Sequence, residues 1–355
     1  MTQPSYQATG LWLDVSELPE LLQATLDQEQ GFSDVAGLLR GRGVERIVIT
    51  GNGASYYVAL ALWLTAIGGS ADAPPVLAVP AGLVLSGGFR WRRGDALLVV
   101  SSSGELRDIL EITRSDSCPR PLAAITGTPS STIARAADAC AVVPHAIQRA
   151  ATHTHAFCGA VLAGLDIWAQ VVGDSELRNV VRGASDACAR ALQGVGQWMD
   201  RATQVTKGGS YVVFGTGVAW AAALEGALLL KEIAQVPAEG AETREAATSL
   251  MTATTGGTLV LALPAGLHGD PLAHEAAGVL AARGAEVLVV PGSEGQDSRL
   301  SPITSFPSFA ALAIERGMRK GLNVDRPDWL DSYNATARAK MSAAPFDQPR
   351  VVGEQ

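Results

Sequence analysis

Short, almost wholly apolar runs alternate along the chain with longer stretches whose apolar residues recur at helical spacing. The runs at 46–50, 96–100 and 122–126 lie in the first half, and those at 211–214, 258–263 and 287–290 in the second. Nearly continuous apolar runs of this length are typical of parallel strands covered on both faces. Alternation with helices predicts an α/β fold with doubly wound parallel sheets, which bind ligands at the carboxyl ends of the strands.

The two halves repeat one another in order. Three matched pairs of glycines end corresponding strands at nearly one spacing: Gly51 and Gly215 lie 164 positions apart, Gly104 and Gly266 lie 162 apart, and Gly127 and Gly292 lie 165 apart. Self-similarity at a fixed period is the sequence signature of a duplicated unit. The chain is therefore interpreted as two copies of one α/β unit.

The repeat also suggests where the domains begin and end. We expect an N-terminal helical segment at 1–44, a first domain at 45–195, a second at 196–335 and a C-terminal tail at 336–355. The pattern of residues 16–28 predicts a helix packed across the domains, with Ser16 as its N-cap and Pro19 in its first turn.

Composition narrows the classes of partner. The 355 residues are 47% hydrophobic and 17% charged, and 27 basic against 35 acidic side chains give a net charge of −8. Without a run of Lys and Arg, this balance argues against binding to nucleic acid or to an anionic membrane. Four cysteines without a CxxC spacing, no signal-peptide pattern and no uncharged apolar stretch long enough to span a bilayer favour a cytoplasmic protein.

Serines follow the strand at 96–100. Ser101, Ser102 and Ser103 precede Gly104 and a helical stretch, and the unpaired N–H groups at a helix N-terminus favour an anion such as phosphate. An ordinary capping turn is the alternative. The turn Gly51-Asn52-Gly53 is less specific, because it lacks the third glycine of a dinucleotide-binding fingerprint.

Five blocks of the sequence together resemble the tandem sugar isomerase (SIS) domain family, which includes the isomerase half of glucosamine-6-phosphate synthase, sugar-phosphate deaminases and amino-sugar deglycases. They are Gly53-Ala54-Ser55, Ser101-Ser102-Ser103-Gly104-Glu105, Thr152-His153-Thr154-His155-Ala156-Phe157, Lys231-Glu232-Ile233 with Ala238-Glu239, and Gly321 to Pro327. The resemblance covers residues 45–335 and implies two tandem SIS domains, each a doubly wound parallel sheet flanked by helices.

The resemblance also assigns roles. Glu232 corresponds to the family's carboxylate that moves a proton between C1 and C2 of an open-chain sugar phosphate. The phosphate is expected at Ser101–Ser103, with the Gly53-Ala54-Ser55 turn and Thr152 beside it. The alternative for Glu232 is a buried structural carboxylate paired with a backbone group or Arg244. Lys231 is expected to point away from the face of Glu232.

The chain departs from the family pattern at four positions. Thr248 stands where family isomerases carry a ring-opening histidine contributed across the dimer, and Ser332 where they carry a C-terminal lysine. Leu229 and Leu106 replace a lysine and a threonine. We keep Thr248 and Ser332 as candidate substrate-binding residues, although a hydroxyl is a poor proton carrier beside an imidazole near pH 7.

Two histidines lie on the segment expected to border the ligand. His153 is a candidate to replace the missing acid/base, and His155 a candidate to bind the substrate. A His-x-His pair also suggests a metal, but no neighbouring cluster of Asp, Glu or Cys supports one. The alternative is that one or both cap a helix or bond to the backbone.

The resemblance implies a homodimer with shared active sites that acts on a sugar phosphate or amino-sugar phosphate without metal or organic cofactor. Its reaction would be an isomerisation, a deamination or a deglycation. One alternative is a sugar-phosphate-binding sensor or complex subunit without catalysis. Another is an enzyme turned to an unphosphorylated or specialised-metabolite substrate.

Overall fold

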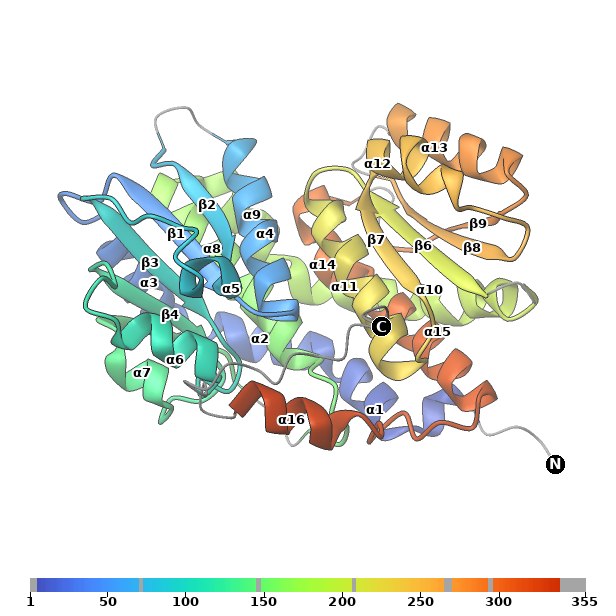
Figure 1. The fold of residues 1–355 in the computed structure, drawn as a ribbon, viewed down its shortest axis with the longest axis horizontal. Coiled ribbons are helices and arrows are strands. Elements are labelled where there is room, and N and C mark those ends of the chain that lie inside the picture. The colour runs from blue at the N-terminus through green and yellow to red at the C-terminus, as the bar shows by residue number, and fades with distance from the viewer. Residues whose placement is uncertain are drawn as a thin grey trace, which may run out of the picture.

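Two parallel β-sheets form the framework of the molecule (Figure 1). The computed structural model describes residues 5–69, 73–144, 148–205, 209–264, 270–292 and 296–338. The first sheet has the order β2-β1-β3-β4-β5 and the second the order β7-β6-β8-β9, with every pairing parallel. The strands are β1 (Arg46–Gly51), β2 (Val76–Pro80), β3 (Asp95–Val100), β4 (Leu122–Thr126), β5 (Ala139–Val142), β6 (Ser210–Gly215), β7 (Ala238–Glu242), β8 (Thr258–Leu263) and β9 (Glu286–Val289).

Helices precede, connect and follow the strands. In the first half they are η1 (Tyr6–Ala8), α1 (Gly10–Ser16), α2 (Leu18–Leu26), α3 (Glu29–Leu39), α4 (Ala54–Ile67), α5 (Ala81–Leu85), α6 (Arg107–Arg114), α7 (Thr132–Ala136), α8 (His155–Val172) and α9 (Ser175–Arg182). They continue with α10 (Ala184–Ala202), α11 (Val218–Ile233), α12 (Thr243–Thr248), η2 (Leu250–Thr252), α13 (Pro271–Ala282), η3 (Ser298–Leu300), α14 (Ser301–Thr304), α15 (Phe306–Arg319) and α16 (Leu330–Arg338).

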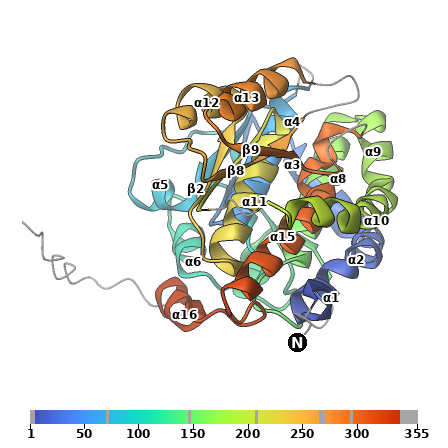
Figure 2. The same ribbon diagram turned by 90° about the vertical axis from the view of Figure 1, so that its right-hand side faces the viewer.

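Each sheet is covered on both faces, which explains why its strands are apolar throughout. In β1, Ile47 and Ile49 pack against α3, α4 and α8, whereas Val48 faces the other way toward α5, α6 and α7. In the second sheet, Val213 faces α10, α11 and α15, and Phe214 faces α12 and α13 (Figure 2). The prediction of an α/β fold with a doubly wound parallel sheet in each copy is confirmed.

The two Gly-x-Gly turns have the same structure in both copies. Gly53 and Gly217 precede α4 and α11 with φ of 54° and 58°, in the left-handed region that glycine tolerates best. A Cβ on Gly51 would come within 2.8 Å of Ser55, and one on Gly215 within 2.6 Å of the carbonyl oxygen of Ala219. The strand-to-helix turn therefore requires both glycines whether or not a ligand lies beside it.

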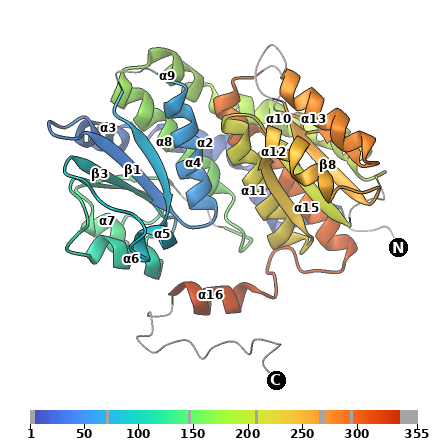
Figure 3. The ribbon, with the colours of Figure 1, turned by 45° about the horizontal axis from the view of Figure 1, so that its top comes forward.

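Helices α4 and α11, which follow the first strands of the two copies, pack against each other between the sheets (Figure 3). Leu60 and Ala61 of α4 are buried against Val218 and Ala221 of α11. The largest core cluster contains residues of both sheets, so the two halves share one hydrophobic core. This packing places α11 of the second half next to the carboxyl ends of the first sheet.

The N-terminal segment differs from its expected form. The helix predicted over residues 16–28 is α2, which begins at Leu18 and ends at Leu26, and a separate helix, α1, precedes it and ends at Ser16. The prediction that Ser16 is an N-cap is wrong, because its hydroxyl donates to the carbonyl of Leu13 and Glu17 occupies the N-cap of α2. Pro19 lies in the first turn of α2, where helix N–H groups lack intrahelical partners.

The proposed domain boundaries cut through helices. The boundary between residues 195 and 196 falls inside α10, and the boundary between 335 and 336 inside α16. Helix α8 is long and apolar enough to cross a membrane by length and composition, but 83% of it is buried within the fold, as in the core helix of a globular protein. The apolar character of α8 is accounted for by its place in the shared core.

Candidate active site

A cavity of about 680 Å³ lies at the carboxyl ends of β1, β3 and β4. Its walls are the N-terminal turns of α4, α6 and α8, the C-terminal half of α11, and α16 with the segment that precedes it. This is the edge of a doubly wound sheet at which ligands bind. The volume is within the range of small-molecule sites.

Three helix N-termini without side-chain caps meet at this cavity. The N-cap positions of α4, α6 and α8 are Gly53, Leu106 and Thr154, and none of their side chains accepts a hydrogen bond from its helix. Helices α7, α9 and α13, by contrast, are capped by Ser131, Asp174 and Asp270. Unpaired N–H groups and aligned peptide dipoles make the meeting point of α4, α6 and α8 a site of positive potential that favours an anion.

The predicted serine loop lies partly on this site. Ser102 and Ser103 line the cavity, as do Gly53, Ala54 and Ser55 of the first turn. Ser101 is fully buried and is not part of the cavity wall; its Oγ accepts from the N–H of Gly104 at 3.2 Å. Ser101 thus holds the shape of the loop, and Ser102 and Ser103 are the members that can reach a ligand.

Glu232 is half-buried on the opposite wall, near the end of α11. Burial raises the pKa of its carboxyl to about 7, and the nearby charge of Lys231 acts against that rise. Arg244, the alternative partner of Glu232, instead pairs with Glu275 at 3.0 Å. The expectation that Lys231 points away is wrong, because Lys231 also lines the cavity.

A second carboxyl of α11 lies deeper in the same cavity. Glu225 is two turns before Glu232, is 3% exposed, and has an Oε2 atom with no hydrogen-bond partner. Burial raises the pKa of Glu225 well above its ordinary value, and the neighbouring charge of Glu232 adds to the shift. Thr152, on the cavity wall at the start of α8, has a buried hydroxyl that is likewise unpartnered.

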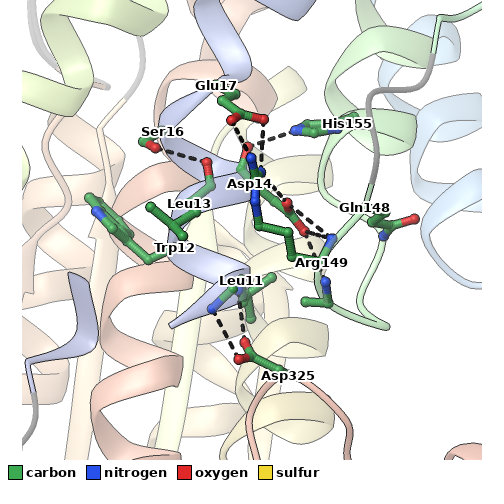
Figure 4. A network of polar contacts seen from close by, with 12 residues as sticks. Leu11, Trp12, Leu13, Asp14, Ser16, Glu17, Gln148, Arg149, His155 and Asp325 are labelled. Carbon is green, nitrogen blue, oxygen red and sulfur yellow. Dashed lines mark hydrogen bonds and ion pairs between the residues drawn. The ribbon is translucent and has the colours of Figure 1, made fainter. Parts of the chain in front are cut away.

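The segment before α8 is held in place by α1 (Figure 4). The buried carboxylate of Asp14 accepts from the backbone N–H groups of Arg149 and Ala150 and from the Arg149 guanidinium, which also pairs with Glu17 at 2.7 Å. Asp325 accepts from the N–H groups of Gly10 and Leu11 at the start of α1. These bonds fix the backbone from which Thr152 and His153 face the cavity.

The two candidate histidines point in different directions. His153 is exposed on the cavity wall. His155 is buried, and its Nε2 lies 2.6 Å from the backbone oxygen of Asp14 (Figure 4), an arrangement in which Nε2–H donates. Burial lowers the pKa of His155, so the ring is neutral near pH 7. The structure therefore brings His153, and not His155, to the cavity.

Thr248 and Ser332 do not line the cavity of their own chain. Thr248 is exposed at the end of α12, and its hydroxyl donates to the carbonyl of Arg244. Ser332 is exposed on α16, whose Tyr333 contributes to the wall instead. Trp329 joins this wall to α11, since its Nε1–H donates to the carbonyl of Glu232 at 2.8 Å.

The second copy has a carboxylate where the first has its cavity. Asp270 caps α13 by accepting from the N–H groups of Leu272 and Ala273, and it also accepts from the hydroxyl of Thr216. Ala265 and Gly266, at the loop expected to replace the serines, lie outside the described residues. The positive end of α13 is thus already matched by a charge of the chain itself.

No group of three or more His, Cys, Asp or Glu within the described part of the chain is placed to hold a metal ion. The expected absence of a metal or organic cofactor stays a prediction. All four cysteines are free, and burial raises the pKa of each thiol.

Several cavity residues were not among the predicted site residues. They are Asn52, Arg107, Asp108, Glu225, Lys231, Trp329 and Tyr333. For Glu225 the signal was present, because its spacing of seven from Glu232 places both on one helix face. Trp329 and Tyr333 reach the cavity because the C-terminal segment returns to the first domain, which no local pattern contains.

No protein-family model matches this chain. Among curated proteins it is similar to a glutamine–fructose-6-phosphate aminotransferase (isomerizing) from Methanothermobacter thermautotrophicus, with 24% identity over 340 residues, which are 88% of this chain and 55% of the relative. Five further proteins of the same description match with 24–27% identity. The chain spans about half the length of the curated relatives it matches.

Solved structures share the fold. The C-terminal domain of glucosamine-fructose-6-phosphate aminotransferase from Francisella tularensis superposes with a TM-score of 0.77 at 18% identity, over 90% of this chain and 98% of that one. Tagatose-6-phosphate ketose/aldose isomerase from Escherichia coli gives 0.75 at 14% identity, over 97% and 98% of the two chains. With its duplicated parallel sheets and its similarity to these proteins, the chain shares the fold of these structures, in agreement with the resemblance to the tandem sugar isomerase (SIS) domain family.

Proposed function

We propose that the cavity binds an open-chain sugar phosphate or amino-sugar phosphate and that Glu232 moves a proton between its C1 and C2 carbons. The observation that carries this proposal is the placement of a half-buried carboxyl, with a pKa of about 7, across a cavity from three uncapped helix N-termini. A general base is most effective when its pKa lies near the working pH. Relatives named for fructose-6-phosphate and tagatose-6-phosphate support the substrate class.

In this scheme the phosphate lies at the N-termini of α4, α6 and α8, held by backbone N–H groups and by Ser102, Ser103 and Ser55. Ionised Glu232 takes the proton from the carbon beside the carbonyl, which leaves an enediolate that becomes an enediol when its former carbonyl oxygen is protonated. The protonated carboxyl then returns the proton to the neighbouring carbon. Isomerisation, deamination and deglycation share this proton transfer, and His153 is the candidate for moving the hydroxyl protons.

The second candidate is a sugar-phosphate-binding sensor or complex subunit. A specific observation favours it. Thr248, Leu229 and Ser332 carry neither a cation nor an imidazole, and all three lie outside the cavity wall of their own chain. If two chains share their active sites, as the family resemblance implies, the partner would have to supply the missing groups. Four free cysteines agree with a proposed cytoplasmic location.

Proton exchange separates an enzyme from a binding protein. Fructose 6-phosphate, glucose 6-phosphate and glucosamine 6-phosphate are each incubated with the protein in D₂O and followed by NMR. Deuterium at C1 or C2 supports catalysis, whereas binding without exchange supports the sensor. Thermal stabilisation by the phosphates and not by the free sugars tests the anion site, because a bound ligand raises stability by mass action. Stabilisation by free sugars alone supports the unphosphorylated substrate.

A further inference from the structure

One buried carboxyl on the cavity wall has an oxygen without a partner within the described structure. Glu225 is 3% exposed, and its Oε2 has neither a hydrogen-bond partner nor contact with solvent. Buried polar atoms in folded proteins are nearly always paired, so an unpartnered carboxyl on the wall of a cavity is available to pair with a ligand. The side chain belongs to a wall of that cavity and not to a closed part of the core.

Among the described residues, Glu232 is the charged group that acts on Glu225. One turn away along α11, Ala221 and Leu229 are fully buried and apolar. The titratable groups that act on it from the packed elements are Tyr57 on α4, Cys158 on α8 and Glu232 on α11, and none of them is positive. An ionised carboxylate buried among such neighbours would be strongly destabilised, so the neutral acid is the favoured form.

A neutral carboxylic acid differs from a carboxylate in what it offers a ligand. The carboxylate only accepts hydrogen bonds, whereas the acid also donates one from its O–H. Glu232, two turns further along the same helix, lies nearer the solvent and has a pKa of about 7. The two carboxyls of α11 therefore suit different roles, one as a base and the other as a donor.

We propose that Glu225 is a protonated acid whose carboxyl O–H donates to an uncharged oxygen, a carbonyl or hydroxyl, of the ligand's carbon chain, and so determines which chains bind. This inference deepens the proposed function and rests on it for the identity of the ligand. It makes Glu225 a specificity-determining residue and leaves proton transfer to and from carbon to Glu232. A ligand that places an apolar group against this carboxyl would leave the O–H unpaired and bind weakly.

Two substitutions distinguish a donor from a carboxylate. Glu225→Gln keeps a hydrogen-bond donor of nearly the same shape without charge, and Glu225→Met removes the donor. We expect affinity for fructose 6-phosphate to stay within about threefold in Glu225→Gln and to fall about 10- to 100-fold in Glu225→Met. Equal losses in both variants, or no loss in either, would overturn the proposal.

Inorganic phosphate serves as the internal control, because it needs only the helix N-termini. Its affinity should be unchanged in Glu225→Met; an equal loss for phosphate would show that Glu225 acts through the fold alone and overturn the proposal. Failure of phosphate and of fructose 6-phosphate to bind the unmodified protein would refute the proposed function, and with it recognition of the sugar by Glu225.

The neutral acid is tested without any ligand. In the infrared spectrum at pH 7, the carbonyl stretch of a protonated carboxyl should be present in the unmodified protein and lost in Glu225→Gln. Glu232→Gln identifies the part of the band that belongs to Glu232, and the exposed Glu286→Gln on β9 is the matched control that should change nothing. A spectrum in which Glu225→Gln removes no such band contradicts the proposal even if sugar phosphates bind.

Discussion

At the scale of the residue, the proposed proton transfer depends on Glu232 and on the charge of its neighbour Lys231, which both line the cavity. Burial raises the pKa of Glu232 to about 7, and the charge of Lys231 limits that rise. Lys231 is exposed at the cavity mouth, so it acts through water and its effect is moderate. The pair adjusts the fraction of Glu232 that is ionised at neutral pH.

The first prediction concerns this pair. Because Glu232 must be ionised to act as a base, kcat/KM should fall as pH drops below about 7. Lys231→Met removes the charge that lowers the pKa, so this acid limb should move to higher pH by roughly half a unit to one unit. Lys231→Arg, which keeps the charge, should leave the limb in place. A limb that does not move in Lys231→Met would exclude Glu232 as the titrating base.

Some site residues could be predicted from the sequence and others could not. Glu232 and the turn at 53–55 follow from motifs at the ends of predicted elements. The prediction that Lys231 points away from Glu232 was wrong. Neighbours on a helix lie about 100° apart, but a long side chain can still reach the same cavity. His153 and His155 differ by two positions across the start of α8, and only the path of the backbone past Asp14 shows which one turns inward.

At the scale of the element, the proposed anion site depends on helix ends. Leu106 occupies the N-cap of α6, where a polar residue usually accepts from the helix backbone. In the second copy, Asp270 does this at α13 and supplies its own negative charge. The uncapped state of α6 is therefore a difference between the copies that a ligand's phosphate can exploit.

The second prediction supplies the missing cap. Leu106→Asp should cap α6 and so retain stability within about 1 kcal/mol, since a cap contributes about 0.5–2 kcal/mol against the lost apolar contact. The new carboxylate should nevertheless weaken phosphate binding by at least about tenfold, because like charges meet at the helix end. Leu106→Asn provides the same cap without charge. Equal phosphate affinity in the two variants, measured by calorimetry at low salt, would argue against an anion site at α6.

The third prediction concerns the bonds between α1 and the segment before α8. Asp14→Asn should lower the free energy of unfolding by about 1–3 kcal/mol, because Asp14 is buried and accepts from two backbone N–H groups. Glu17→Gln, on the exposed side of Arg149, should change it by less than about 1 kcal/mol. Urea denaturation measures both.

Asp14→Asn should also weaken fructose 6-phosphate binding, since it releases the backbone that carries Thr152 and His153. Lost stability with unchanged affinity would mean that the segment does not need α1 for its position.

The strands and central helices were predictable because their apolar pattern is continuous. The presence of α1 before Ser16, and the start of α2 at Leu18, were not, since two successive helices can continue one apolar face without a break in the helical period.

At the scale of the whole molecule, duplication explains both the architecture and its asymmetry. The order of elements recurs in the two sheets, and α4 packs on α11 between them. The copies differ at their carboxyl edges, where the first has the cavity and the second has Asp270. The repeat made the fold predictable, but the use of α11 and α16 as walls for the first copy required the folded chain.

The fourth prediction follows from the shared core. Since one hydrophobic cluster contains residues of both sheets, the two halves should unfold in a single transition, with calorimetric and van't Hoff enthalpies equal. A sugar phosphate should raise the whole transition and not half of it. Two separate transitions, of which the ligand moves only one, would show that the halves are independent.

Proton transfer by Glu232 is the central claim, and deuterium exchange in the Glu232→Gln variant tests it most directly. The account predicts that fructose 6-phosphate binds this variant within about threefold of the unmodified protein, while incorporation of solvent deuterium at C1 or C2 falls about 10²–10⁴-fold. Exchange at an undiminished rate in a variant that binds the sugar phosphate normally would contradict it.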